Sequence, residues 1–89
     1  MITEPQLNAV AQRIATAYLN DELITQLRAE FAPLHFTYCL DDDVSGFAPV
    51  LENDKFNLYL IDASEHCLKL TNNHETATGI VVAEVIADD

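Results

Sequence analysis

Apolar positions in the first third of the chain recur every three or four residues, which is the spacing of one helical face. Thr3 opens this pattern as an N-cap, and Gln6 three positions later completes a capping box. A second apolar stripe ends before Pro33, which cannot continue a helix. The pattern therefore predicts helices at residues 4–18 and 20–31. The residues on their predicted apolar faces are Leu7, Val10, Ile14, Tyr18, Leu23, Ile24, Leu27 and Phe31.

Further along the chain the apolar period changes to two, and residues 80–86 form a nearly continuous apolar run broken by Glu84; we interpret both patterns as strands. Aromatic and β-branched residues dominate these segments, as is typical of a pleated and half-buried surface. The predicted strands are residues 34–41, 55–62, 66–71 and 79–87. Periodicity alone also allows a helix over residues 75–86.

This order of elements predicts one α+β domain over residues 1–89. Short connections favour a mainly antiparallel sheet of four strands, with both N-terminal helices packed on one face. We expect the side chains of Phe36, Tyr38 and Leu40 to lie on that face. The opposite face is expected to be wetter, and to carry Thr37, Cys39, Asn57, Tyr59, Cys67 and Lys69.

The composition favours a folded protein that binds other proteins. Residues of apolar type make up 49% of the 89, which is enough for one core. Fifteen acidic residues against four basic ones give a net charge of −11, and the acids occur in both halves of the chain. Such a surface repels phosphate backbones and anionic lipids, so we expect no binding to nucleic acid or membranes. A positively charged protein patch is the natural complement, and solubility alone is the alternative explanation.

We expect no export signal at the start of the chain. Residues 1–5 have neither a basic start nor an apolar run. No apolar stretch approaches the roughly 20 residues that a bilayer requires. We therefore expect a cytoplasmic protein.

Two cysteines and three histidines raise the question of a metal site. The sequence has no CxxC or HxxxH spacing, and His66 and Cys67 are neighbours that a strand turns to opposite faces. In a simple meander Cys39 and Cys67 would lie on strands about 9.6 Å apart. That separation exceeds the roughly 7 Å that a disulfide allows between Cα atoms. We expect reduced thiols, no metal and no cofactor.

Cys67 is also the candidate for thiol chemistry. On a strand it would share a face with Lys69, and a nearby cation favours the thiolate. The sequence places no base beside it, and no oxyanion donor or glycine-rich turn accompanies it. We expect no enzymatic activity, and a small thiol or redox protein that uses Cys67 is an alternative.

Three aspartates follow the first predicted strand directly. Asp41, Asp42 and Asp43 lack the alternating pattern and the distal glutamate of a calcium-binding EF-hand loop. One interpretation is a solvated strand end. The other is an acidic tip, by which we mean Asp41–Asp43, that steers the protein to a basic groove on a partner.

Four segments carry a resemblance to a known group of proteins. They are residues 35–44 (HFTYCLDDDV), 56–62 (FNLYLID), 66–68 (HCL) and 77–84 (ATGIVVAE). Together they resemble a small acidic bacterial family that is encoded beside nitrogen-fixation genes and is similar to nitrogenase-associated factor T. The resemblance spans most of residues 34–86.

The resemblance implies a non-catalytic, chaperone-like nitrogenase accessory protein in the cytoplasm of a nitrogen-fixing bacterium. Its implied partner is the molybdenum–iron protein during cofactor maturation, protection or repair. The family offers no catalytic residues to carry over. A general acidic decoy that imitates nucleic acid is the alternative binding function. The residues that we expect to contact a partner are Asp41, Asp42, Asp43, Cys39, Tyr59 and Cys67.

Overall fold

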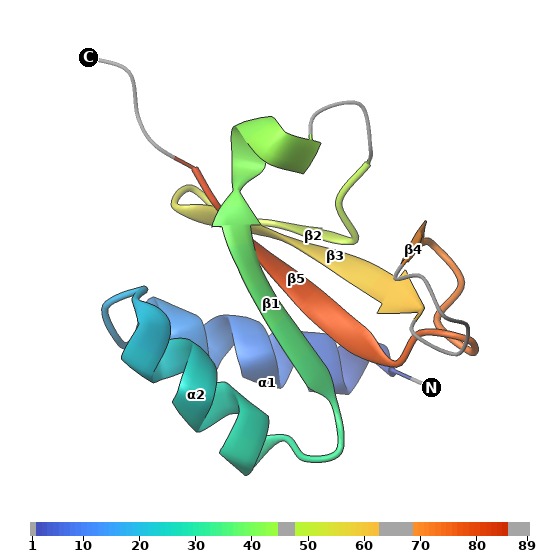
Figure 1. Cartoon of the computed structure of the whole chain (residues 1–89), viewed down its shortest axis with the longest axis horizontal. Helices are drawn as coiled ribbons and strands as arrows, with labels where there is room; N and C mark the ends of the chain where they lie inside the picture. The colour runs from blue at the N-terminus through green and yellow to red at the C-terminus, as the bar shows by residue number, and fades with distance from the viewer. Residues whose placement is uncertain (1, 45–47, 63–68, 86–89) are drawn as a thin grey trace.

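The chain forms two helices followed by a mixed sheet of five strands (Figure 1). The computed structural model describes residues 2–44, 48–62 and 69–85. The predicted α+β fold with N-terminal helices packed on a sheet is confirmed, although the sheet has one strand more than predicted. In chain order the elements are α1 (Glu4–Ala15), α2 (Asp21–Glu30), β1 (His35–Leu40), the 3-10 helix η1 (Asp41–Val44), β2 (Leu51–Glu52), β3 (Phe56–Asp62), β4 (Lys69–Thr71) and β5 (Gly79–Glu84).

Both helices begin at side-chain caps that the sequence provides. Thr3 and Gln6 form the predicted capping box at the start of α1. At the start of α2 the side-chain oxygen of Asn20 accepts a hydrogen bond from the Leu23 N–H at 2.9 Å. In the described part of the chain, no helix has the length and apolarity needed to cross a membrane.

The first helix is shorter than predicted, and Tyr18 lies outside it. Helix α1 ends at Ala15, where the Ala17 N–H bonds to the Ile14 carbonyl in a tighter turn. Tyr18 was predicted on the buried face, but its side chain is 88% exposed. The prediction was wrong because the apolar spacing continues past the residue at which the backbone leaves the helix.

The sheet has the strand order β1-β5-β3-β2, and β4 pairs with the same edge of β3 as β2 does. Strand β2 pairs with the start of β3 and β4 pairs with its end, so these two short strands share one position. Strand β2 lies between the predicted strands at residues 34–41 and 55–62, where the sequence predicts no strand. Its two residues are too few to show a period of two.

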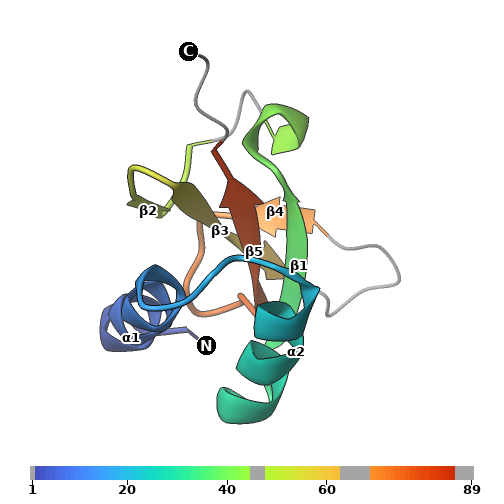
Figure 2. The same ribbon diagram turned by 90° about the vertical axis from the view of Figure 1, so that its left-hand side faces the viewer.

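Strand β1 pairs in parallel with β5, and the other pairings are antiparallel. A simple meander is therefore the wrong topology, because β5 inserts between β1 and β3 (Figure 2). Strand β5 pairs with β1 on one side and with β3 on the other, which rules out the helical alternative for residues 75–86. Parallel neighbours need a long crossover, and here that crossover contains the rest of the sheet.

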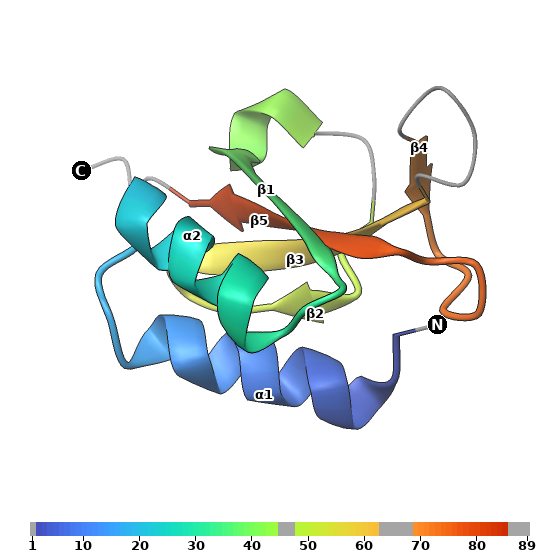
Figure 3. The same ribbon diagram turned by 60° about the horizontal axis from the view of Figure 1, so that its bottom comes forward.

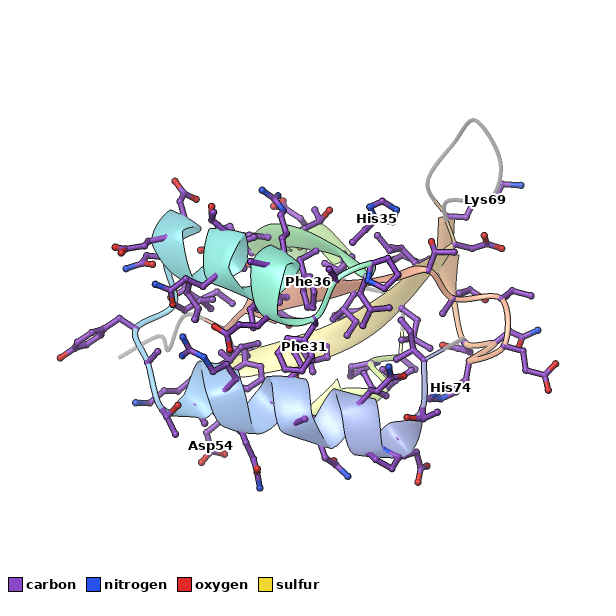
Figure 4. All side chains as sticks on the ribbon, turned by 90° about the horizontal axis from the view of Figure 1, so that it is seen from below. Phe31, His35, Phe36, Asp54, Lys69 and His74 are labelled. Atoms are coloured by element: carbon purple, nitrogen blue, oxygen red, sulfur yellow. The ribbon has the colours of Figure 1, made fainter. Side chains whose placement is uncertain are left out.

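Both helices cover one face of the sheet, as predicted (Figure 3). Their apolar faces meet alternate residues of the strands in one large core. The Phe31 and Phe36 rings lie side by side in this interior, with centroids 6.2 Å apart (Figure 4). The buried core residues are Ile2, Leu7, Val10, Ile14, Leu23, Ile24, Leu27, Phe36, Phe56, Leu58, Leu60, Ala77, Ile80 and Val82.

The opposite face of the sheet is drier than predicted. A second buried cluster lies there, formed by Tyr59, Ile61, Val81 and Ala83. Leu70 packs against this cluster, so it faces away from the helices. Of the residues expected on this face, Thr37 is exposed and Cys39 and Asn57 are half-buried. Lys69 is also exposed, but it neighbours Leu70 on β4 and therefore belongs to the helix-facing side. Cys67 lies outside the described residues.

Candidate functional site

The three aspartates of the acidic tip form the start of η1, directly after the last residue of β1. Helix η1 contacts both β1 and β5, so the tip sits at one end of the sheet. The three side chains have different surroundings. Asp41 is half-buried, whereas Asp42 and Asp43 are exposed.

Asp41 holds η1 to the sheet. Its Oδ1 atom accepts hydrogen bonds from Asn57 Nδ2 at 2.9 Å and from Tyr59 Oη at 3.1 Å. Both donors belong to β3, and β5 lies between β3 and β1. The residue of β5 that pairs with Asn57 is Ala83, and its single methyl group leaves room for the Asp41 carboxylate to reach across β5 to β3. The acidic tip is thus fixed to the central strands by its first residue.

Tyr59 is placed to position Asp41 and offers little surface to a partner, since it is only 4% exposed. Burial raises the pKa of its hydroxyl, and the hydrogen bond to the Asp41 carboxylate raises that pKa further. The hydroxyl therefore stays protonated at neutral pH and keeps donating to Asp41.

Cys39 is a free, half-buried thiol on the same face as Tyr59. Burial raises its pKa, and the negative charges of Asp43 and Asp41 raise it further. Because the thiolate is the reactive form, this environment makes Cys39 a poor nucleophile. Its geometry suits packing beside the acidic tip.

Cys67 lies outside the described residues, so its expected role stays a prediction. Strand β4 begins two residues later, at Lys69. The order of strands places β4 three positions from β1, a distance of roughly 14 Å. The strand that follows Cys67 is therefore farther from Cys39 than the meander implied.

The described residues contain no group of three or more histidine, cysteine, aspartate or glutamate side chains that could hold a metal ion. Within the acidic tip, the Asp41 carboxylate accepts hydrogen bonds from β3, and the Asp42 and Asp43 side chains are exposed. They can present negative charge to a partner.

Sequence reasoning missed a second set of residues, at the end of β1. Tyr38 and Leu40 were expected on the buried face with Phe36, but each is 37% exposed. Tyr38 donates a hydrogen bond to the carboxylate of Glu84 on β5. That bond is the main cause that raises the pKa of Tyr38 to about 12, with burial and the charge of Glu84 adding to it. These side chains are exposed because β1 lies at the edge of the sheet. Apolar periodicity does not indicate which strand is at the edge, so no signal in the sequence points to this surface.

A groove of about 370 Å³ lies elsewhere, between the end of α1 and the turn that precedes β3. Ile14 and Phe56 line it together with the charged residues Asp54, Lys55 and Glu84. Charges of both signs at its wall do not single out one class of ligand.

No curated protein and no solved structure matches the chain. Residues 9–85 match a family of unknown function, DUF6129. The match begins within α1 and ends one residue after β5, so it covers most of the helical layer and the whole described sheet. The chain belongs to the DUF6129 family.

Proposed function

We propose that this protein is a non-catalytic accessory factor that binds a positively charged surface on another protein. The observation that carries the proposal is that the three aspartates of the acidic tip differ in their contacts and exposure. Asp41 is bonded to Asn57 and Tyr59, which fixes the position of η1, and Asp42 and Asp43 remain exposed. Charges on a segment of fixed position can orient an approaching partner. Binding then costs less conformational entropy, because the backbone of that segment is already ordered.

The use of the basic residues supports the same proposal. Arg13 on α1 donates to Glu30 at 3.0 Å and to Gln26 at 2.7 Å, which ties the two helices together. Arg28 donates to the carbonyl of Phe36. Two of the four basic side chains thus make internal contacts, and the sequence has fifteen acidic residues against four basic ones.

We further propose that the partner is the molybdenum–iron protein of nitrogenase, bound in the cytoplasm while its cofactor site is incomplete, maturing or under repair. The resemblance of the four sequence segments supports this identity. An anionic cofactor needs cationic surroundings to enter its site, so a cofactor-deficient enzyme exposes basic surface. An acidic protein could cover that surface and leave when the cofactor arrives.

Capture from nitrogen-fixing cells tests the proposal. The bait is the whole protein, and the lysates come from normal cells and from cells that cannot complete the cofactor. We expect the molybdenum–iron protein to be retained mainly from the deficient cells. Capture of DNA-binding proteins in place of nitrogenase would contradict the proposed partner and favour the acidic decoy.

A matched pair of variants locates the interface. Asp42→Lys with Asp43→Lys should reduce capture about tenfold, because it reverses the charges that face the basic surface. Glu52→Lys with Glu75→Lys makes the same change in net charge at exposed positions outside η1 and should reduce capture much less. Equal loss in both pairs would show that net charge acts without the acidic tip. Capture that persists after Cys67→Ser would dismiss the alternative of a thiol protein.

A further inference from the structure

Strand β1 is the outer strand of the sheet, and half of its backbone hydrogen-bonding groups turn away from β5. The His35 N–H donates to the Thr78 carbonyl beside β5, at 3.1 Å. In a parallel pair every second residue bonds to the same neighbour, so His35, Thr37 and Cys39 face β5. The backbone groups of the alternate residues, Phe36, Tyr38 and Leu40, point away from the sheet.

Helix α2 closes only the first part of this edge. The Arg28 guanidinium donates to the Phe36 carbonyl from Nε at 3.3 Å and from Nη2 at 3.1 Å. Beyond that point no described strand lies against β1, and the Tyr38 N–H and carbonyl and the Leu40 N–H are left for a partner. An open edge of this kind is a template for a further strand.

The surroundings of the open edge are apolar and acidic. Tyr38 and Leu40 are two exposed large hydrophobic side chains of the described chain, and they are adjacent along one face of β1. Glu84 bonds to the Tyr38 hydroxyl, and the Asp21 carboxylate at the start of α2 is close enough to act on its charge state. The acidic tip begins at the next residue of the chain, Asp41.

We propose that the open half of β1 receives an extended, basic segment of a partner protein as an added strand. Backbone hydrogen bonds to Tyr38 and Leu40 would hold the segment, as in other cases of strand addition. Side chains of a strand alternate between faces, so arginine or lysine at every second position would lie on the helix-facing side of the added strand, where Glu84 and Asp21 are. This inference rests on the proposed protein-binding function and does not depend on the identity of the partner.

A second copy of this chain is the other possible occupant, and the charge argues against it. Each copy carries a net charge of −11. Pairing β1 with β1 about a twofold axis would bring the same acidic residues of both copies together. Their mutual repulsion disfavours such a dimer unless high salt screens it. A basic segment gains from the same charges.

The test uses the whole protein and a short, end-blocked peptide of alternating valine and arginine. Amide hydrogen exchange followed by NMR should show the Tyr38 and Leu40 amides slowed about tenfold or more when the peptide binds. The Thr37 and Cys39 amides face β5 and serve as internal references. The fully N-methylated peptide has the same charge, but its methyl groups keep the two backbones apart and it has no backbone N–H to donate to the Tyr38 carbonyl. It should leave the Tyr38 and Leu40 amides unprotected.

A pair of variants distinguishes the contribution of the Leu40 N–H to peptide binding from that of the Leu40 side chain. Leu40→Pro removes the outward N–H without breaking a bond to β5, and it should weaken peptide binding about tenfold. Leu40→Ala keeps that N–H and should change binding by less than about threefold. If Leu40→Pro fails to fold, the exchange experiment on the unaltered protein still decides.

Three results would overturn the inference: equal binding of the methylated peptide, equal binding by the proline variant, or protection of the same amides by dimer formation of the protein alone. Failure here is distinguishable from failure of the proposed function. Capture of nitrogenase without protection of Tyr38 and Leu40 would remove the edge and keep the partner. Protection by the peptide without nitrogenase capture would keep the edge and remove the partner.

Discussion

Asp41 and Asp42 are identical residues one position apart, yet the structure gives them opposite tasks. Asp41 bonds to two side chains of β3, whereas Asp42 faces solvent. The same contrast separates Tyr59, which is buried, from Tyr38, which is partly exposed at the sheet edge. At the scale of single residues, therefore, the partner of a side chain decides its role more than its type does.

Asp41→Ala should lower the free energy of unfolding by about 2 kcal/mol, because it leaves the half-buried Asn57 amide and the buried Tyr59 hydroxyl without their acceptor. Asp42→Ala should change it by less than about 0.5 kcal/mol, as is usual for exposed positions. Urea denaturation of the two variants measures the difference. Equal stability of the two would show that the Asp41 hydrogen bonds do not fix η1.

The Cys39 thiol should ionise above its ordinary pKa, because it is half-buried beside Asp43 and Asp41. The pH profile of alkylation by iodoacetamide measures this in a Cys67→Ser background, where Cys39 is the remaining cysteine. The folded-state pKa is raised, so the contribution of this group to stability is complete below the unfolded pKa. It is lost as pH rises through the folded value.

Asp43→Asn in the same background provides the control for the cause of that shift. Removing one negative charge should move the alkylation midpoint down toward the ordinary value for a thiol. A midpoint at or below the ordinary value in the unaltered chain would mean that Cys39 is more reactive than its surroundings imply.

The sequence was a good guide to elements whose signals are local. Thr3 and Gln6 cap α1 as predicted, because a cap and the N–H groups it satisfies lie within three residues, and Asn20 caps α2 in the same local way. The helix-facing positions of β3, which are Phe56, Leu58 and Leu60, follow from its period of two, whereas β5 is buried on both faces and shows a nearly continuous apolar run. Tyr18 was misplaced because apolar spacing does not mark the residue at which a helix ends.

Pairing between distant elements could not be predicted in the same way. The neighbours β1 and β5 are separated by most of the sheet-forming sequence, and nothing in either strand specifies the other or the parallel direction. The acceptor role of Asp41 was hidden for the same reason, since Asn57 and Tyr59 lie 16 and 18 residues further along the chain. Only the position of the acidic residues after β1 could be predicted.

Gly79 is the local feature that permits the β1–β5 pairing. A Cβ atom at this position would lie 2.6 Å from the His35 carbonyl oxygen and 2.8 Å from the His35 Cβ. Gly79→Ala should therefore push the first residues of the two strands apart and lower the free energy of unfolding by about 1–3 kcal/mol. Thermal or urea unfolding measures this. An unchanged stability would mean that the strands do not approach as closely as described.

At the scale of the whole molecule, two features act together. The fold places an acidic tip and an open strand edge at the same end of the sheet, and α2 protects only part of that edge. The net charge of −11 discourages the chain from pairing with itself there. A protein built in this way can stay monomeric and still offer an edge to a basic partner.

The most direct test of the account is the salt dependence of association between the purified protein and cofactor-deficient molybdenum–iron protein. Raising the salt from about 0.1 M to about 1 M shortens the range of electrostatic interactions from roughly 10 Å to roughly 3 Å. The account predicts that the association rate constant falls about tenfold or more over this range, and that the Asp42→Lys, Asp43→Lys variant loses most of that dependence. An association rate and affinity that stay the same at both salt concentrations would contradict it.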